Sequence, residues 1–153
     1  MTLTTWRIVK ARRAADAFDG EGARLEGGRW NSPGTAMVYT SQSAALAALE
    51  MLVHLGRGSM LSAYVLMPCA FDHALVSRLD RTRLPDNWRS YPAPPQLQQI
   101  GDEWVRGGAS AVLEVPSAVI ETDSNHLLNP HHRGFRTVRV MKPQPFEFDL
   151  RLA

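Results

Sequence analysis

The sequence has a single cysteine, Cys69, so it cannot form an intramolecular disulfide or a zinc site built on several cysteines. It also has no run approaching the roughly 20 apolar residues that cross a bilayer. Its first residues show no basic segment followed by an apolar one, as a secretory signal requires. These absences argue against a disulfide-rich or membrane-spanning protein, and we expect a soluble protein of the reducing cytoplasm.

The sequence also has no large excess of positive or negative charge. The chain has 17 Lys and Arg residues against 15 Asp and Glu residues, a formal net charge of +2, and these residues are spread along the sequence. Because there is no basic stripe to neutralise phosphates, we expect no direct binding to nucleic acid.

Two motifs that mark common hydrolases are absent. No His-Glu-x-x-His sequence occurs, and His54, His131 and His132 lack the spacing of a catalytic zinc site, so we expect no metal. No Gly-x-Ser-x-Gly sequence occurs either, which argues against a serine nucleophile of the α/β-hydrolase type. Any enzymatic chemistry must therefore rest on other residues.

The apolar content is sufficient for one core. Of the 153 residues, 44% are hydrophobic and 21% are charged, as is typical of a single globular domain, here 1–153. Helical periodicity predicts a helix over 44–55 and another from Pro95 to Gly107 and Gly108. Strands that precede and follow these helices without regular alternation favour an α+β fold, with a mixed, largely antiparallel sheet and flanking helices. The predicted strands are 6–9, 37–40, 60–67, 111–115, 118–120, 135–141 and 146–150.

The stretch 27–34, Gly-Gly-Arg-Trp-Asn-Ser-Pro-Gly, has the composition of a binding loop. Four of its eight residues are Gly or Pro, so the backbone can turn tightly and approach a ligand closely. Arg29 and Asn31 supply donors there, and an arginine in a glycine-rich turn favours a phosphate or carboxylate ligand. The alternative is an ordinary hairpin turn with a solvated arginine.

Glu50 lies within the apolar arc of the predicted helix 44–55. At about 100° per residue it is about 40° from Leu46 and about 60° from Val53. Burial of an unpaired carboxylate costs several kcal/mol, so Glu50 either faces a cleft or meets a cation, for which Arg29 is the candidate. His54, one turn later, is the expected i,i+4 partner of Glu50. Alternatively, Arg29 and Glu50 form a purely structural ion pair.

Two polar residues follow later apolar segments. Ser117 comes after the predicted strand 111–115 and, without a nucleophile motif, is better suited to hydrogen bonding with a ligand than to covalent catalysis. Asn129 precedes a proline, which biases it toward extended geometry at a pocket mouth, although it could equally bond its own turn. Asn125 is close enough in sequence to take that role instead.

Five motifs in order along the chain resemble the RES domain family. The resemblance runs from about Trp6 to near the C-terminus, and the family is named for an Arg, a Glu and a Ser that match Arg29, Glu50 and Ser117. The motifs are Gly-Gly-Arg-Trp-Asn at 27–31, Val-Tyr-Thr at 38–40, Leu-Glu-x-Leu-Val-His at 49–54, Val-Pro-Ser at 115–117 and Leu-Leu-Asn-Pro-x-His at 127–132.

This resemblance implies a fold similar to ADP-ribosyltransferase toxins and a function in a bacterial toxin–antitoxin pair. The chain would be the toxin and would break down NAD, its substrate, or transfer the ADP-ribose of NAD. No metal is implied. The implied partner is an antitoxin with an Xre-like helix-turn-helix, so that DNA is bound only through the antitoxin, and the toxin could form a homodimer within a larger complex.

The resemblance also assigns roles to single residues. Arg29 would hold the pyrophosphate, Tyr39 would stack on the nicotinamide or its ribose, and Glu50 would stabilise the positive charge that develops on the ribose. The acceptor of the ADP-ribose stays open among water, phosphate and a protein side chain, and a non-catalytic ligand-binding or interaction domain is the alternative class. The implied catalytic residues are Arg29, Tyr39, Glu50 and Ser117, and the implied NAD contacts are Arg29, Trp30, Asn31, Tyr39, Ser117 and Asn129.

Overall fold

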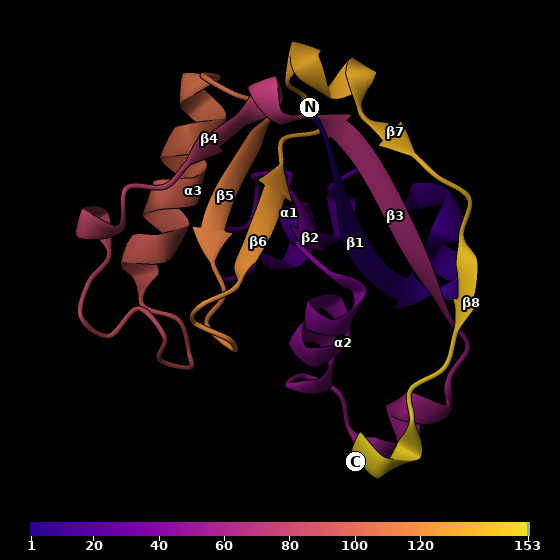
Figure 1. Cartoon of the computed structure of the whole chain (residues 1–153). Helices are drawn as coiled ribbons and strands as arrows, with labels where there is room; N and C mark the ends of the chain where they lie inside the picture. Colours follow the sequence, from indigo (N-terminus) through magenta and orange to yellow (C-terminus); the bar gives the residue numbers. More distant parts are fainter. Residues whose placement is uncertain (153) are drawn as a thin grey trace.

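The structure, a computed structural model, describes residues 1–152 and is built on one eight-stranded sheet (Figure 1). The strand order is β4-β5-β6-β2-β1-β3-β7, and β8 also pairs with β3. The β4–β5 pair is parallel and the other pairs are antiparallel, which confirms the predicted α+β fold with a mixed, largely antiparallel sheet. The strands are β1 Thr2–Lys10, β2 Val38–Ser41, β3 Tyr64–Asp72, β4 Val76–Arg78, β5 Val112–Pro116, β6 Ser124–Leu128, β7 Arg139–Val140 and β8 Gln144–Phe146.

Three α-helices accompany this sheet within residues 1–152: α1 Glu21–Glu26, α2 Ala44–Leu52 and α3 Pro95–Gly107. In Figure 1, α3 flanks the β4–β5 edge, whereas α2 lies below the middle of the sheet. Short 3-10 helices occupy Ala11–Asp16, Arg57–Leu61, His73–Leu75, Arg81–Arg83, Arg133–Thr137 and Leu150–Leu152. None of the helices in this described range has the length and apolar character needed to traverse a lipid bilayer.

The sheet consists of two halves that meet at one position. β1 pairs with β3 along nine residues, and β2 pairs with β6 along four. Between the halves, the described pairing of β1 with β2 is limited to Trp6 opposite Ser41. The backbone ladder is therefore interrupted in the middle of the sheet, where other groups must fill the space between the two strands.

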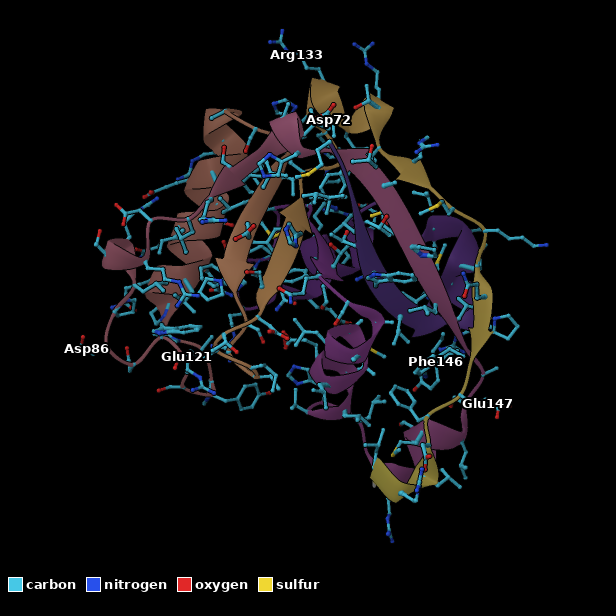
Figure 2. All side chains as sticks on the ribbon, viewed as in Figure 1. Asp72, Asp86, Glu121, Arg133, Phe146 and Glu147 are labelled. Atoms are coloured by element: carbon cyan, nitrogen blue, oxygen red, sulfur yellow. The ribbon has the colours of Figure 1, made fainter. Side chains whose placement is uncertain are left out.

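Several apolar clusters stabilise the sheet, and one of them joins the two halves by packing Val38 of β2 with Phe71 of β3. α3 places Leu97 and Ile100 against Trp30 and Met37, next to the β5–β6 half. α2 packs Ala47 against Ile8 of β1 in another cluster. At the far end of the β1–β3 half, the ring of Phe146 meets the ring of Phe148 edge-on at a centroid distance of 5.0 Å, near the lower end of β3 (Figure 2).

The predicted helices are confirmed, although α2 is shorter than expected. The hydroxyl of Ser43 caps α2 by accepting the Leu46 N–H at 3.0 Å, and the helix ends at Leu52 instead of residue 55. In α3, Pro95 occupies the first turn and Gly108 terminates the helix in the left-handed region, where glycine is favoured.

The predicted strand 60–67 is displaced, since the strand found there is Tyr64–Asp72 and includes Pro68. The carbonyl of Pro68 accepts the N–H of Met141, so the side of Pro68 that lacks an N–H faces the β7–β8 segment. β8 pairs with residues 64–66 and β7 with residues 69–70, which leaves Pro68 opposite the interval between them. Proline is tolerated here because no ladder hydrogen bond is required from it.

The predicted strand 118–120 is wrong, and β6 was not predicted. The hydroxyl of Ser117 accepts the N–H groups of Val119, at 3.1 Å, and Ile120, at 3.0 Å, which folds this apolar segment into a turn. The chain then returns as β6, whose sequence Ser-Asn-His-Leu-Leu has few β-branched residues to mark it.

The two predicted C-terminal strands are also mostly displaced. The segment 135–141 begins in a 3-10 helix and contributes only β7 to the described sheet, and β8 ends at Phe146, where the last predicted strand was expected to start. These strands cover an edge of β3, so their extent depends on pairing and not on local propensity.

Gly101 fixes the approach of α3 to the glycine-rich loop, and we expect Gly101→Ala to destabilise the fold by about 3 kcal/mol. A Cβ at Gly101 would lie 1.6 Å from the backbone oxygen of Trp30. Overpacking substitutions typically cost about 1–3 kcal/mol of stability, and a clash with backbone belongs at the upper end of this range. Gly107→Ala is the matched control, because a Cβ there meets nothing within 4 Å and helix propensity favours alanine by about 1 kcal/mol. Urea unfolding measures both free energies; equal midpoints would contradict the assigned packing.

Candidate active site

A cavity of about 380 Å³ opens where β1 and β2 separate. The walls come from β1, α1, the glycine-rich loop, β2, α2 and β6. Six of the residues that line it bear on its chemistry: Arg7, Gly28, Arg29, Tyr39, Glu50 and Asn125. The structure therefore brings Arg29, Tyr39 and Glu50 together, as expected, in a space of the size that small-molecule ligands occupy.

Asn31 holds the glycine-rich loop in shape. Its side chain is buried, and its Nδ2 donates to the carbonyls of Ala23 at 2.8 Å and Thr35 at 3.0 Å. The Tyr39 hydroxyl donates to Asn31 Oδ1 at 2.6 Å. Asn31 does not line the cavity, and both ends of its amide are engaged inside the protein.

Tyr39 forms a rigid part of the cavity wall. Its hydroxyl accepts the N–H of Trp30 at 2.9 Å, and a Cβ at Gly28 would come within 2.7 Å of the same oxygen, so only glycine allows this approach. Burial raises the pKa of Tyr39 well above its ordinary value, which keeps the phenol neutral. The indole of Trp30 packs into the apolar core with 2% of the residue exposed, although Trp30 also borders the cavity.

Arg29 connects the cavity to the loop between Arg83 and α3. Its Nη1 donates to the carbonyls of Trp88 at 2.9 Å and Ser90 at 3.1 Å. Partial burial lowers the pKa of Arg29, while the charge of Glu50 opposes that change, and the guanidinium stays cationic at neutral pH. Nη1 is used by the protein, and the other guanidinium N–H groups have no hydrogen-bond partner among residues 1–152.

Glu50 is held by neutral donors. Asn125 Nδ2 and Ser117 Oγ both donate to Glu50 Oε2, the latter at 3.3 Å. Asn125 Oδ1 in turn accepts from Ser41 Oγ at 2.7 Å, which fixes the orientation of the amide. No residue in the described chain forms an ion pair with Glu50, so of the two alternatives the carboxylate faces the cleft, and Arg29 lines the same cavity without forming a salt bridge to it.

Arg7 is a cavity residue that the sequence reasoning missed. Its Nε donates to the Ala17 carbonyl at 2.9 Å and its Nη1 donates to the Tyr39 carbonyl at 3.0 Å, across the separation between β1 and β2. Burial lowers the pKa of Arg7, and the nearby charge of Asp19 opposes this shift. A charged residue within the otherwise apolar strand 6–9 was the available signal. The cavity thus has two guanidinium groups.

The RES domain model matches residues 4–149 of the chain. The chain belongs to the RES domain family.

Relatives agree with this membership, and a solved structure has the same fold. The chain is 41% identical to "Toxin Res" of Yersinia enterocolitica over 96% of this chain and 97% of the relative. It is 36% identical to "Prs ADP-ribosylating toxin" of Sphingobium sp. over 99% of this chain and 98% of that one. The toxin fold in the M. tuberculosis MbcT–MbcA toxin–antitoxin complex matches with a TM-score of 0.76 at 20% identity, over 96% of this chain and 85% of the other.

Ser117, which matches the serine in the name of the RES family, lies behind the cavity wall. Ser117 is fully buried and does not line the cavity, and its hydroxyl is divided between Glu50 and the N–H groups of the following turn. In this RES domain, Ser117 therefore contacts the carboxylate and not the open space where a ligand would bind.

Asn129 lies outside the cavity of this RES domain. Asn129 Oδ1 accepts the N–H of His131 at 3.0 Å, and the residue is 5% exposed. Asn125, four residues earlier, is the asparagine that lines the wall and contacts Glu50. The structure thus favours the alternative position for a ligand contact.

His54 does not pair with Glu50, and that expectation is wrong. α2 ends at Leu52, and the His54 ring instead lies 5.8 Å from the Tyr91 ring, between centroids. No group of three or more His, Cys, Asp or Glu residues within residues 1–152 is arranged to hold a metal ion.

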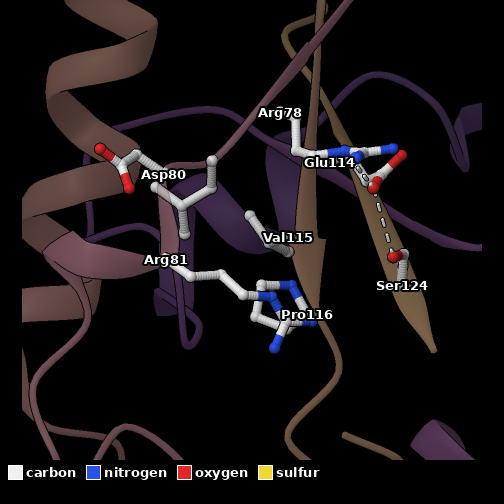
Figure 3. Close-up of a pocket in the computed structure, with 8 residues that line it drawn as sticks. Arg78, Asp80, Arg81, Glu114, Val115, Pro116 and Ser124 are labelled. Carbon is white, nitrogen blue, oxygen red and sulfur yellow. Dashed lines mark hydrogen bonds and ion pairs between the residues drawn. The ribbon is translucent and has the colours of Figure 1, made fainter. Parts of the chain in front are cut away.

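A second cavity of about 370 Å³ lies beside β4 and β5 (Figure 3). Two of its charged residues pair with each other, since Arg78 Nε is 3.1 Å from Glu114 Oε2, and Ser124 Oγ is 3.4 Å from the same oxygen. Val115 and Pro116 of the Val-Pro-Ser motif line it, but Arg29, Tyr39 and Glu50 line the first cavity and not this one. The first cavity is therefore the candidate active site.

Proposed function

We propose that this chain is the toxin of a toxin–antitoxin pair and cleaves NAD at the bond between nicotinamide and ribose. One observation carries this proposal: a single cavity combines two guanidinium groups, an aromatic wall and a carboxylate oriented by neutral donors. The names of the toxin relatives, at 41% and 36% identity, support it.

The charges of the cavity suit a dinucleotide. Arg29 keeps guanidinium N–H groups free of described protein partners, and Arg7 supplies a second cation from β1. Guanidinium groups bind phosphates through paired, charge-assisted hydrogen bonds, so both can contact the pyrophosphate. The neutral ring of Tyr39, fixed through its hydroxyl, offers a surface for the nicotinamide ribose.

Glu50 would act on the ribose. When the glycosidic bond breaks, the electron pair leaves with the nicotinamide nitrogen and positive charge develops on the ribose ring. A carboxylate already oriented by Asn125 and Ser117 stabilises that charge without reorganisation during the reaction. Ser117 and Asn125 are thus positioning residues that act through Glu50.

Transfer of ADP-ribose to a protein is the second candidate for the same site. It is favoured by the relative named as an ADP-ribosylating toxin, which aligns with 99% of this chain. Both candidates share the departure of nicotinamide and differ only in the acceptor: water or phosphate in one case, and a protein side chain in the other.

The partner in this proposal is an antitoxin that blocks the cavity. One solved structure with this fold is that of a toxin–antitoxin complex. The balanced charge of the chain, +2 over 153 residues, suits a toxin that leaves DNA binding to a helix-turn-helix partner.

We expect the purified chain to release nicotinamide from NAD, because the cavity stabilises the departing ribosyl centre. Nicotinamide is quantified by chromatography, with and without inorganic phosphate, and protein is checked by mass spectrometry for added ADP-ribose. Free ADP-ribose indicates hydrolysis, ADP-ribose 1″-phosphate indicates phosphorolysis, and a mass gain on protein indicates transfer. Saturable binding of NAD with no released nicotinamide would contradict the enzyme and support a non-catalytic binding domain.

A further inference from the structure

Tyr91 is a large aromatic residue that is exposed beside the candidate active site. It is 78% exposed and lies in the proline-rich loop between Arg83 and α3. Its ring is 5.8 Å from that of His54, with an interplanar angle of 51°, and His54 lines the cavity. An aromatic surface therefore stands in water next to the cavity mouth, where burying it would be favourable.

The Tyr91 loop is fastened on both sides. On one side, Arg29 Nη1 donates to the carbonyls of Trp88 and Ser90. On the other, Arg89 Nε donates to the Ala118 carbonyl at 3.0 Å. The ring is therefore presented from a fixed backbone, as a stacking surface requires, and not from a free tail.

An ion pair reinforces the second attachment. Arg89 Nη1 lies 3.8 Å from the carboxylate of Glu121, which belongs to the β5–β6 loop and is labelled below these two strands in Figure 2. The same loop contains Ala118, which lines the cavity, and Ser117, which contacts Glu50. The loop of Tyr91 thus connects the Arg29 side of the cavity with the Glu50 side.

The size of the cavity leaves part of a dinucleotide outside. Its volume of about 380 Å³ is at the lower end of the range for ligand pockets, and a dinucleotide is close to twice the size of a mononucleotide. If the nicotinamide ribose lies next to Glu50 and the pyrophosphate next to Arg29, the adenosine must continue past Arg29. The next fixed surface in that direction is the loop that Arg29 itself holds.

We propose that Tyr91, supported by His54, is the stacking surface for the adenine base and makes the enzyme selective for a dinucleotide over a mononucleotide. This inference rests on the proposed NAD cleavage. Bases stack on aromatic side chains without any need for hydrogen-bond readout, which suits an exposed ring with no polar pocket around it. Arg29 would then have two functions at once, because it would bind the pyrophosphate and also hold the loop that carries Tyr91.

The test compares NAD with nicotinamide mononucleotide, which has the same scissile bond but lacks the adenosine. We expect Tyr91→Ala to lower the ratio of kcat/KM for NAD to kcat/KM for the mononucleotide about tenfold, mainly through a higher KM for NAD, as expected for the loss of one stacked base. Tyr91→Phe keeps the ring and should retain the wild-type ratio.

Each outcome bears on the proposal. An unchanged ratio in Tyr91→Ala, or an equal loss for both substrates, would overturn it, because either result means that Tyr91 does not contact the adenosine half. If the wild-type chain cleaves neither substrate, the proposed function is wrong, and calorimetry with ADP-ribose tests the stacking surface alone. There, about tenfold weaker binding by Tyr91→Ala supports the surface, and an equal Kd rejects it.

Discussion

Glu50→Gln should lower the rate of nicotinamide release by about 100-fold or more while the protein stays folded. Removal of one preorganised electrostatic group from an active site typically costs this much. Glutamine keeps the length of the side chain, and its amide oxygen can still accept from Asn125 and Ser117, so the substitution removes the charge and preserves the contacts. The loss should appear in kcat more than in KM, because the charge acts on the transition state.

Glu147→Gln is the matched control for Glu50→Gln. Glu147 is exposed near the lower end of the molecule, away from the lining of the cavity (Figure 2). The control should keep wild-type turnover and the same thermal unfolding midpoint. If Glu50→Gln also retains most of its turnover, the carboxylate only shapes the cavity wall, and the proposed stabilisation of the ribosyl cation fails.

Local chemistry made several elements predictable from the sequence. The start of α3 at Pro95 and its end at Gly108 each depend on neighbouring residues, so each could be predicted before any tertiary contact was known. For α2, both Ser41 and Ser43 could serve as the cap, and the structure selects Ser43. The apolar face of α3 with Leu97 and Ile100 was equally local, since it follows from the helical period.

The strands were harder to place because pairing decides their limits. Residues 118–120 have strand-like composition, but the Ser117 hydroxyl captures their N–H groups. β6 looks polar at its start, yet it is central because β2 and β5 pair with it on either side. Neither fact can be derived from the local sequence.

Within the site, motif residues were predictable and their partners were not. The sequence singled out Arg29 and Glu50, and it left open whether Glu50 faces a cleft or pairs with Arg29. In the structure Arg29 binds carbonyls about sixty positions away, and Glu50 is held by Asn125. Arg7 was missed because an arginine in a strand usually faces solvent, whereas here β1 and β2 separate and the side chain fills the space between them.

Arg29→Ala should lower kcat/KM for NAD by about 100-fold or more, and the loss should be larger than for any other exposed or half-buried arginine. Each charge-assisted hydrogen bond contributes about 1.5–3 kcal/mol, and Arg29 would supply two to the pyrophosphate. The same substitution frees the carbonyls of Trp88 and Ser90 and releases one attachment of the Tyr91 loop. Both effects weaken substrate binding, so KM should rise.

Arg83→Ala is the control for the loss of a guanidinium. Arg83 forms a surface ion pair with Glu103 at 3.1 Å, and it does not line the cavity. Exposed ion pairs contribute little to stability, so this variant should match the wild type in KM and in its free energy of unfolding.

Arg29→Lys separates the two functions of Arg29, because a lysine keeps the positive charge but cannot donate to two carbonyls and a phosphate in a fixed fork. If Arg29→Lys retains full kcat/KM, charge alone is needed at this position. If Arg29→Ala leaves KM unchanged, the pyrophosphate does not bind to Arg29 and must be reassigned to Arg7.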